Sequence, residues 1–341
     1  MSADITPSWA QVHPSMVLPE IIMQYQQASG AFNMLPNCEP LVRLGKGMLQ
    51  VYAKVMNIRT KSTASTHAAN ILPGVSITSK MINVPTYLIR SGADYDHHDI
   101  ESANNWGYSL PEAQRLGMRQ GIYQIMRNAL LYGMNPSTGE GLANTAGATA
   151  VTLPPDSNGN QNVSTYDPGQ MAIFLLTQIG ALKARMMHIG MPTKIRILTP
   201  QRVQSQLTYS GIVQLTQFQR EGAGTDTVAG MVERVAGEVA GDDVEWELDD
   251  TLIGAGTGGT DLIIINAPVV KKPIRSGINT NEFATLTPGM EATVLMLSDM
   301  SAPMEIVSPL SQGGTNVISE IRVTPGWGLR PEAITLISMA Y

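Results

Sequence analysis

The clearest hydrophobic pattern in the chain lies between Ser109 and Gly133, where apolar residues recur at helical spacing. The residues that carry this pattern are Leu116, Ile122, Ile125, Met126, Ala129 and Leu130. Ser109 can cap the start of the helix with Glu112 completing a capping box, and Pro111 is tolerated in the first turn. Gly133 is the residue type expected just past a helix end. The pattern predicts one long helix of about 35 Å, at a rise of about 1.5 Å per residue.

Upstream of this helix, residues 48–58 and 75–89 are rich in β-branched and aromatic side chains and predict two strands. A polar run separates them, so together they predict an extended hairpin. Such a hairpin either packs on the edge of its own domain or is received by a neighbouring molecule, and the sequence leaves both open. A short helix is expected at residues 20–27, within a proline-rich N-terminal segment.

Downstream, short helices and short apolar strands alternate, which predicts an α/β layer. Asp167 is a plausible N-cap followed by Pro168, with Gln170 at the capping-box position. The following elements are expected to be a strand at 194–199, a helix from 201 to about 209, and strands at 244–248 and 261–266. Residues 134–166 predict an ordered loop, and residues 291–341 predict mostly strands with turns at 313–314 and 325–326.

Composition changes this picture in one respect, because the chain has few charges for its size. Charged residues make up 15% of the 341 positions, below the roughly 25% of soluble domains, and there are 20 methionines. These features favour a surface that is buried against partners. The net charge of −6 argues against a protein that grips nucleic-acid phosphates through a basic face.

The sequence carries few features that indicate a cellular compartment. Cys38 is the only cysteine, so no disulfide within the chain is expected, and a reducing cytosol is the simplest place for folding. The first residues carry no signal-peptide pattern, and no apolar run approaches about 18 residues. The sequence therefore predicts neither standard secretion nor a membrane span.

Two segments suggest chemistry at first sight. The run at 93–101 gathers Asp94, Asp96, His97, His98, Asp99 and Glu101. These residues suit either a metal site or a hydrogen-bonded junction that leads into the long helix, and we favour the junction. The run G-A-G-T-G-G at 254–259 precedes a strand instead of following one, so a hairpin turn is favoured over a dinucleotide site.

Signatures of phosphate-binding loops, nucleophile elbows and zinc-protease helices do not occur in the sequence. We therefore predict no catalytic residue, no cofactor and no metal. An α/β enzyme that uses His97 and His98 with a metal is kept as the less favoured alternative.

The order of elements resembles the major capsid proteins of tailed bacteriophages, whose fold is called the Hong Kong 97 fold and is shared by encapsulin shells. The matching parts are the N-terminal arm, the extended hairpin, the long helix ending N-A-L-L-Y-G at 128–133, and the α/β block from 167. The closing segment G-W-G-L-R-P-E-A-I-T-L-I at 326–337 also resembles the final strand region of that family.

The resemblance implies an α+β fold divided into four parts. Residues 1–44 would be the N-terminal arm and 45–92 the extended loop called the E-loop. Residues 93–166 and 306–330 would form the P-domain, with its spine helix at 109–133. Residues 167–305 and 331–341 would form the α/β A-domain.

The function implied by the resemblance is that of a structural shell protein and not an enzyme. Hexamers and pentamers of the chain would close an icosahedral head, assembled in the host cytoplasm, that becomes part of the virion and encloses double-stranded DNA without sequence-specific binding. A separate scaffolding protein and a portal are expected partners, a decoration protein is an optional one, and no membrane is involved. An encapsulin-type compartment that encloses an enzyme is the alternative reading.

Six basic residues are candidates for contacts between subunits: Arg59, Lys61, Lys80, Arg115, Arg119 and Arg127. The three on the long helix form a charged flank, for which an ordinary solvated face is the competing interpretation. Some members of the family close their shells with lysine-to-asparagine isopeptide bonds, and Lys61 and Lys80 are the candidate lysines here. No motif identifies a matching asparagine or catalytic carboxylate, so noncovalent closure is expected.

Overall fold

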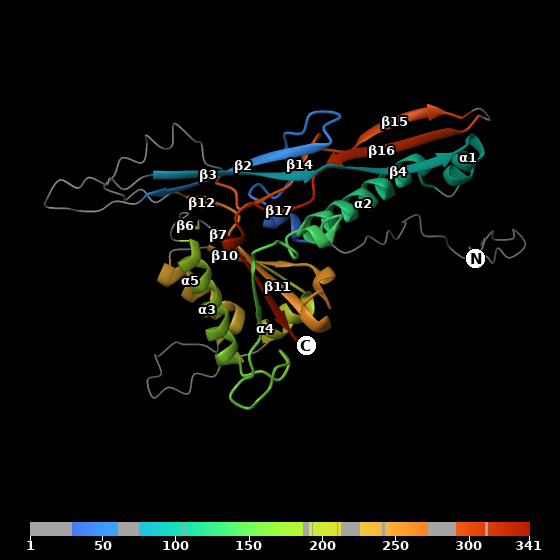
Figure 1. Cartoon of the computed structure of the whole chain (residues 1–341). Coiled ribbons are helices and arrows are strands. Elements are labelled where there is room, and N and C mark those ends of the chain that lie inside the picture. The colour runs from blue at the N-terminus through green and yellow to red at the C-terminus, as the bar shows by residue number, and fades with distance from the viewer. Residues whose placement is uncertain are drawn as a thin grey trace, which may run out of the picture.

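The computed structural model of the chain describes residues 29–60, 75–105, 107–186, 191–192, 194–209, 211–212, 226–240, 243–271, 291–310 and 313–341. This part of the chain consists of an elongated body, which carries the long helix, and a compact block in which helices pack on a sheet (Figure 1). The helix expected at 20–27 and the tip of the predicted hairpin at 61–74 lie outside the described residues.

The elongated body is built around strand β16, Thr315–Val323. β16 pairs antiparallel with β4 (Tyr87–Tyr95) along one edge and with β15 (Met304–Pro309) along the other. β14 (Leu297–Ser298) also pairs with β16, and β1 (Leu41–Val42) adds to β14 in parallel. The long helix α2 (Leu110–Leu131) packs along β4 and β16.

The expected hairpin is present as β2 (Gln50–Thr60) and β3 (Val75–Pro85), which pair antiparallel over all eleven residues of each strand. The single strand predicted over 75–89 is in fact two strands, because the chain leaves the hairpin at Thr86 and enters β4. Thr86 is fixed there by its hydroxyl, which donates to the carbonyl oxygen of Met48 at 2.6 Å.

The compact block contains a second five-stranded sheet. Its strand order is β10 (Asp243–Leu248), β7 (Lys194–Thr199), β11 (Asp261–Asn266), β18 (Ile334–Met339) and β5 (Thr149–Thr152). The β10–β7 and β18–β5 pairs are parallel and the other two pairs are antiparallel. Three helices cover one face of this sheet: α3 (Pro168–Met186), α4 (Gln201–Tyr209) and α5 (Val228–Ala240).

A second apolar core joins the block to the elongated body. Leu198, Leu262 and Ile264 project from the other face of the block sheet and pack with Ile122 and Leu130 of α2. Ile321 and Val323 of β16, with Val294 and Met296, complete this core. The sheet of the block is therefore buried on both faces, as its continuous apolar strands require.

The remaining elements are short. The other helical turns are α1 (His97–Asn105), η2 (Ala31–Met34), η3 (Pro136–Thr138), η4 (Asp250–Leu252), η5 (Thr257–Gly259) and η6 (Pro331–Ala333). The other strands are β6 (Met191–Pro192), β8 (Gly211–Ile212), β9 (Asp226–Thr227), β12 (Val270–Lys271), β13 (Val294–Leu295) and β17 (Trp327–Gly328).

Both predicted helix starts lie where the sequence indicated, but their caps differ from the expectation. Ser109 occupies the N-cap of α2 with extended backbone, yet its side chain makes no capping hydrogen bond. Asp167 does cap α3, because its Oδ1 accepts from the N–H of Gln170 at 2.8 Å. The side chain of Gln170 bonds Ser157 instead of completing the capping box. Gly133 has the predicted left-handed backbone, with φ of 73°.

Two expectations for the middle of the chain need correction, and one helix there was missed. The segment 134–166 is not only a loop, because β5 pairs with β18 within it. Helix α5 was not predicted at all. The run at 254–259 is not a hairpin turn between paired strands, since β10 and β11 are separated by β7, and it forms a short 3₁₀ turn instead. None of the helices in the described residues is long and apolar enough to cross a membrane.

Candidate assembly surfaces

The root of the hairpin β2–β3 has one face against the protein and one face turned away from it. At its root, Val51 and Ile82 pack against a third apolar core that includes Leu297 and Trp327. Because successive strand residues point to opposite faces, Tyr52 and Met81 lie on the other face. Both side chains are 61% exposed. The root of the hairpin therefore presents large apolar side chains that no described part of the chain covers.

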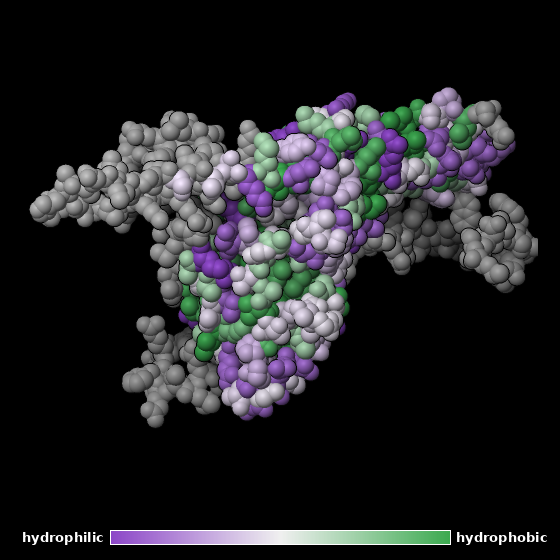
Figure 2. Space-filling model, in the orientation of Figure 1, coloured by the Kyte–Doolittle hydropathy of each residue, from purple (hydrophilic) through white to green (hydrophobic). Residues whose placement is uncertain are grey.

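Apolar exposure continues at two other places on the elongated body. Met48 and Leu49, just before β2, are exposed, and so are Ile306 and Val307 of the edge strand β15. Figure 2 shows hydrophobic residues set among hydrophilic ones along this body. An edge strand with exposed apolar side chains and free backbone groups is a surface that soluble monomers usually avoid. The body is thus suited to contact with other molecules.

The structure gives two of the six candidate basic residues a partner within the chain. Glu305 on β15 lies 3.2 Å from Nε of Arg115 and accepts a hydrogen bond of 3.0 Å from Arg119. The first part of the charged flank therefore holds α2 to the edge of its own sheet. Arg127 lies a further two turns along the helix, half-buried, and its Nε has no hydrogen-bond partner among the described residues.

Two of the other three candidates lie on the described strands of the hairpin. Lys80 is exposed on β3, where it pairs in register with Val55. Arg59 lies near the end of β2 opposite Ser76. Lys61 lies outside the described residues. The role of all six residues in contacts between subunits stays a prediction.

The acidic and histidine-rich run at 93–101 is the hydrogen-bonded junction that the sequence favoured. Asp96 and Asp99 cap the start of α1 reciprocally: the N–H of Asp99 donates to Asp96 at 2.9 Å and the N–H of Asp96 donates to Asp99 at 3.1 Å. The backbone hydrogen bond from Asp99 lowers the pKa of the Asp96 carboxyl. Among the described residues, no group of three or more potential ligands is arranged to hold a metal ion.

A site that the sequence analysis missed fixes the N-terminal segment to the compact block. Arg196 on β7 is almost fully buried, and its guanidinium donates to the carbonyl oxygens of Asn33 and Leu35, the latter at 3.1 Å. Its Nε also donates to Glu245 on the neighbouring strand β10 at 3.0 Å. Hydrogen bonds from Lys194 and Arg196 lower the pKa of the Glu245 carboxyl.

Three further contacts complete this arm anchor, by which we mean the attachment of residues 29–35 to the block. The side-chain amide of Asn266 donates to the carbonyl oxygen of Met34 at 3.1 Å. The hydroxyl of Ser29 donates to Asp249. The side chain of Met34 is fully buried in the second core. The one available sequence signal was an arginine in the middle of the apolar strand K-I-R-I-L-T, which is a position where an unpaired charge would be costly.

Comparisons of sequence give no match to any family model or curated protein. Comparison with solved structures does give matches. The capsid of Myoviridae phage XM1 matches with a TM-score of 0.65 and 11% identity, over 95% of this chain and 96% of that chain. The capsid of cyanophage P-SCSP1u matches with a TM-score of 0.58 and 14% identity, over 99% of both chains.

A third structure, the capsid of an empty GTA particle, matches with a TM-score of 0.56 and 12% identity, over 97% of this chain and 96% of that chain. All three likenesses extend over nearly the whole of both chains, so they concern the complete architecture and not one shared motif. At this level of identity they establish the fold. The chain therefore has the Hong Kong 97-type fold of phage capsid proteins.

Proposed function

We propose that this chain is the major capsid protein of a tailed bacteriophage, which assembles into an icosahedral shell around a double-stranded DNA genome. The observation that carries the proposal is the whole-chain likeness to capsid structures, together with a hairpin whose outward face is covered by no described part of its own chain. A hairpin with exposed apolar residues gains most of its stabilisation when another subunit covers it.

In this proposal the parts of the chain take the roles expected from the fold. Residues 1–44 act as the arm, 45–92 as the E-loop, 93–166 and 306–330 as the P-domain, and 167–305 with 331–341 as the A-domain. Contacts between subunits are noncovalent and form hexamers and pentamers. The net charge of −6 suits a wall that encloses DNA without gripping its phosphates. A separate scaffolding protein and a portal would act with it in the host cytoplasm.

Truncation of the hairpin tests this proposal. Residues Thr60 and Val75 are paired in register, so a two-residue Asn-Gly turn can replace 61–74 and keep the strands joined. We expect the shortened chain to fold, with an unchanged circular dichroism spectrum and melting temperature, and to form no closed shells. Normal shells from this variant would contradict the role assigned to the hairpin.

Denaturing electrophoresis shows whether the subunits of a shell are joined by covalent bonds. Shells closed by noncovalent contacts dissociate under denaturing electrophoresis to a single band at 36.6 kDa, the mass of one chain. A ladder of higher bands would show that isopeptide cross-links form. Replacement of Lys80 by Arg, which keeps the charge and removes the reactive amine, would then test whether Lys80 supplies the bond.

A further inference from the structure

Positive and negative charges are segregated along the part of the chain that forms the elongated body. Residues 40–93, which cover β1, the hairpin and most of β4, contain no Asp or Glu. The same stretch contains seven basic residues: Arg43, Lys46, Lys54, Arg59, Lys61, Lys80 and Arg90. Of these, Arg90 pairs with Glu320 on β16. Residues 91–114 reverse the pattern, because they contain no Lys or Arg and five acidic residues: Asp94, Asp96, Asp99, Glu101 and Glu112.

The basic and the acidic segment lie far apart in space. Figure 1 shows the hairpin β2–β3 and helix α1 at opposite ends of the elongated body, with β4 running between them. β4 is nine residues long, which at about 3.3 Å per residue is roughly 30 Å. Salt screens charges over about 8 Å at physiological ionic strength. The hairpin is therefore not neutralised by residues 94–112 of its own chain, which we call the acidic end.

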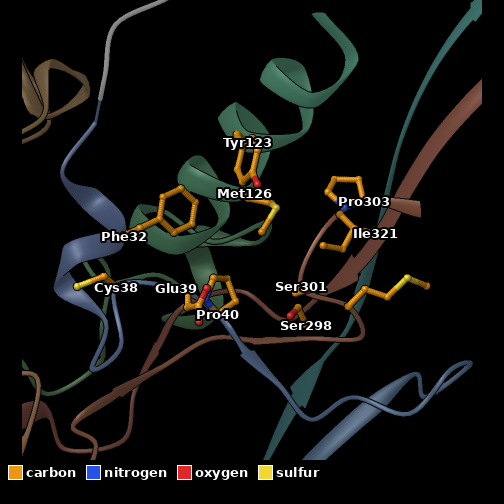
Figure 3. A pocket seen from close by; sticks show the side chains of 11 residues that line it. Phe32, Cys38, Glu39, Pro40, Tyr123, Met126, Ser298, Ser301, Pro303 and Ile321 are labelled. Carbon is orange, nitrogen blue, oxygen red and sulfur yellow. The ribbon is translucent and has the colours of Figure 1, made fainter. Parts of the chain in front are cut away.

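Basic side chains on and beside the hairpin are also without acidic neighbours. Arg43, Lys46 and Lys80 are exposed, and none of the three forms an ion pair with a described residue. Glu39, the acidic residue just before this stretch, lies against the body instead. It lines a cavity of about 220 Å³ together with Tyr123 of α2 (Figure 3). The positive charge of the hairpin is thus available to a partner.

The acidic end is unpaired in the same sense. None of its five carboxylates forms an ion pair with a lysine or arginine among the described residues. Asp96 and Asp99 are held in place by their reciprocal caps, and Glu101 is exposed on α1. The acidic end also presents an exposed aromatic ring, Tyr108, whose N–H donates to the carbonyl oxygen of Ala103 at 3.3 Å.

We propose that the basic hairpin of one copy of this chain docks on the acidic end of a neighbouring copy. The inference rests on the proposed function, which brings the hairpin of one copy against another. Complementary charge selects the partner surface and fixes its orientation. Because the two surfaces lie at opposite ends of one body, the contact is head to tail, the kind that closes into rings such as hexamers and pentamers.

A protein surface suits the hairpin better than nucleic acid, the other acidic partner that a basic surface attracts. Tyr52 and Met81, each 61% exposed, lie on the uncovered face of the hairpin. A phosphate backbone would leave these apolar side chains uncovered, whereas the acidic end offers Tyr108 as well as carboxylates. An apolar centre with a charged rim is the usual composition of a protein interface.

Reversal of one charge at each end tests the contact. Lys80→Glu and Glu101→Lys should each raise the subunit concentration needed for shells about fivefold, because each replaces an attraction across the interface by a repulsion. The double variant restores opposite charges and should assemble near the wild-type concentration. Glu233→Lys is the matched control, since it makes the same change in net charge at an exposed position on α5, and it should assemble normally.

Carbodiimide cross-linking identifies the contact directly, because the reagent joins an amine to a carboxylate that touches it. Shells are assembled from equal amounts of ¹⁵N-labelled and unlabelled subunits, and the linked peptides are found by mass spectrometry. We expect peptides that join Lys46 or Lys80 to an acidic residue of 94–112, with labelled and unlabelled partners mixed. Mixed labels show that the bond joins two copies.

The outcomes separate this inference from the proposed function. Normal assembly of Lys80→Glu, or a double variant that assembles no better than the single variants, overturns the docking site and leaves the shell function standing. Cross-links from the hairpin lysines to acidic residues elsewhere also overturn it. So does a Lys80→Glu variant that forms normal shells with less DNA, since the hairpin then contacts nucleic acid. Failure of the wild-type chain to form shells under any condition overturns both.

Discussion

Replacement of Arg196 by Met should release the arm anchor and lower the stability of the subunit more than the loss of an ordinary ion pair. Methionine keeps most of the buried aliphatic stem of the arginine, so the change mainly removes the guanidinium. The carbonyl oxygens of Asn33 and Leu35 then lose the donor that Arg196 supplies. Glu245 keeps its hydrogen bond from Lys194 at 2.6 Å.

The magnitude follows from these contacts. The carbonyl oxygen of Asn33 loses its donor, which costs about 1–3 kcal/mol for a buried acceptor. The carbonyl oxygen of Leu35 keeps the N–H of Cys38 at 3.2 Å and loses one hydrogen bond of about 0.5–1.5 kcal/mol, so the two together cost roughly 2–4 kcal/mol. Glu245 adds little because water reaches it. A loss of this size is a large fraction of the 5–15 kcal/mol that typically separates folded from unfolded protein.

Urea unfolding of the unassembled subunit, followed by tryptophan fluorescence, measures this loss. Arg90→Met is the matched control, because Arg90 forms a similar ion pair with Glu320 at 2.8 Å but is largely exposed. It should lower the free energy of unfolding by less than about 1 kcal/mol. Limited proteolysis should also cut Arg196→Met near residues 29–40 faster than the control. Equal losses of stability in the two variants would refute the reasoning.

Three further predictions concern the same subunit. Gly326→Ala should destabilise the subunit by more than about 2 kcal/mol, because the added Cβ would lie 2.5 Å from the carbonyl oxygen of Leu130. Gly121→Ala, with open space around the added Cβ, should instead stabilise α2 by about 1 kcal/mol. Urea unfolding measures both changes. The lowered pKa of Glu245 means that its contribution to stability is complete above its ordinary value of 4.5 and is lost as the pH falls through the lowered value. Unfolding midpoints between pH 5 and pH 3 should therefore fall less steeply in Glu245→Gln, and an unchanged slope would be the contrary result. Glu305→Gln removes both ion pairs to α2, but the two arginines are exposed, so the free energy of unfolding should fall by less than about 1 kcal/mol. A much larger fall would contradict the view that exposed ion pairs contribute little to stability.

Local signals in the sequence were enough to place the elements that they specify. The strand at Lys194–Thr199, the helix at Gln201–Tyr209 and the strand at Asp261–Asn266 have the predicted bounds, because each is a short apolar run with clear turn residues at its ends. The cap at Asp167 was predictable for the same reason.

Elements that depend on distant partners were not predictable. β5 is a run of four residues, T-A-V-T, and it becomes a strand only because β18 lies parallel beside it. Helix α5 contains four valines and two glycines, which have low helix propensity, and is held by packing against α3 and α4. Tertiary contacts override local preference at both places.

Some features of the candidate assembly surfaces were likewise predictable from the sequence, and others were not. The hairpin was predictable from alternation and composition, but the pairing of Arg115 and Arg119 with Glu305 joins residues almost two hundred positions apart. Ser298 and Tyr123 likewise come together only through the fold. Sequence patterns identify what a segment can form, whereas these contacts depend on which segments the topology places side by side.

Electron microscopy of the purified chain tests the central claim most directly. If the chain is a major capsid protein, it forms closed, hollow particles of uniform diameter, alone or together with its scaffolding protein, and image reconstruction shows hexamers and pentamers with hairpins lying on neighbouring subunits. A small oligomer of fixed size under every condition, with its hairpin free of other subunits, would contradict the account.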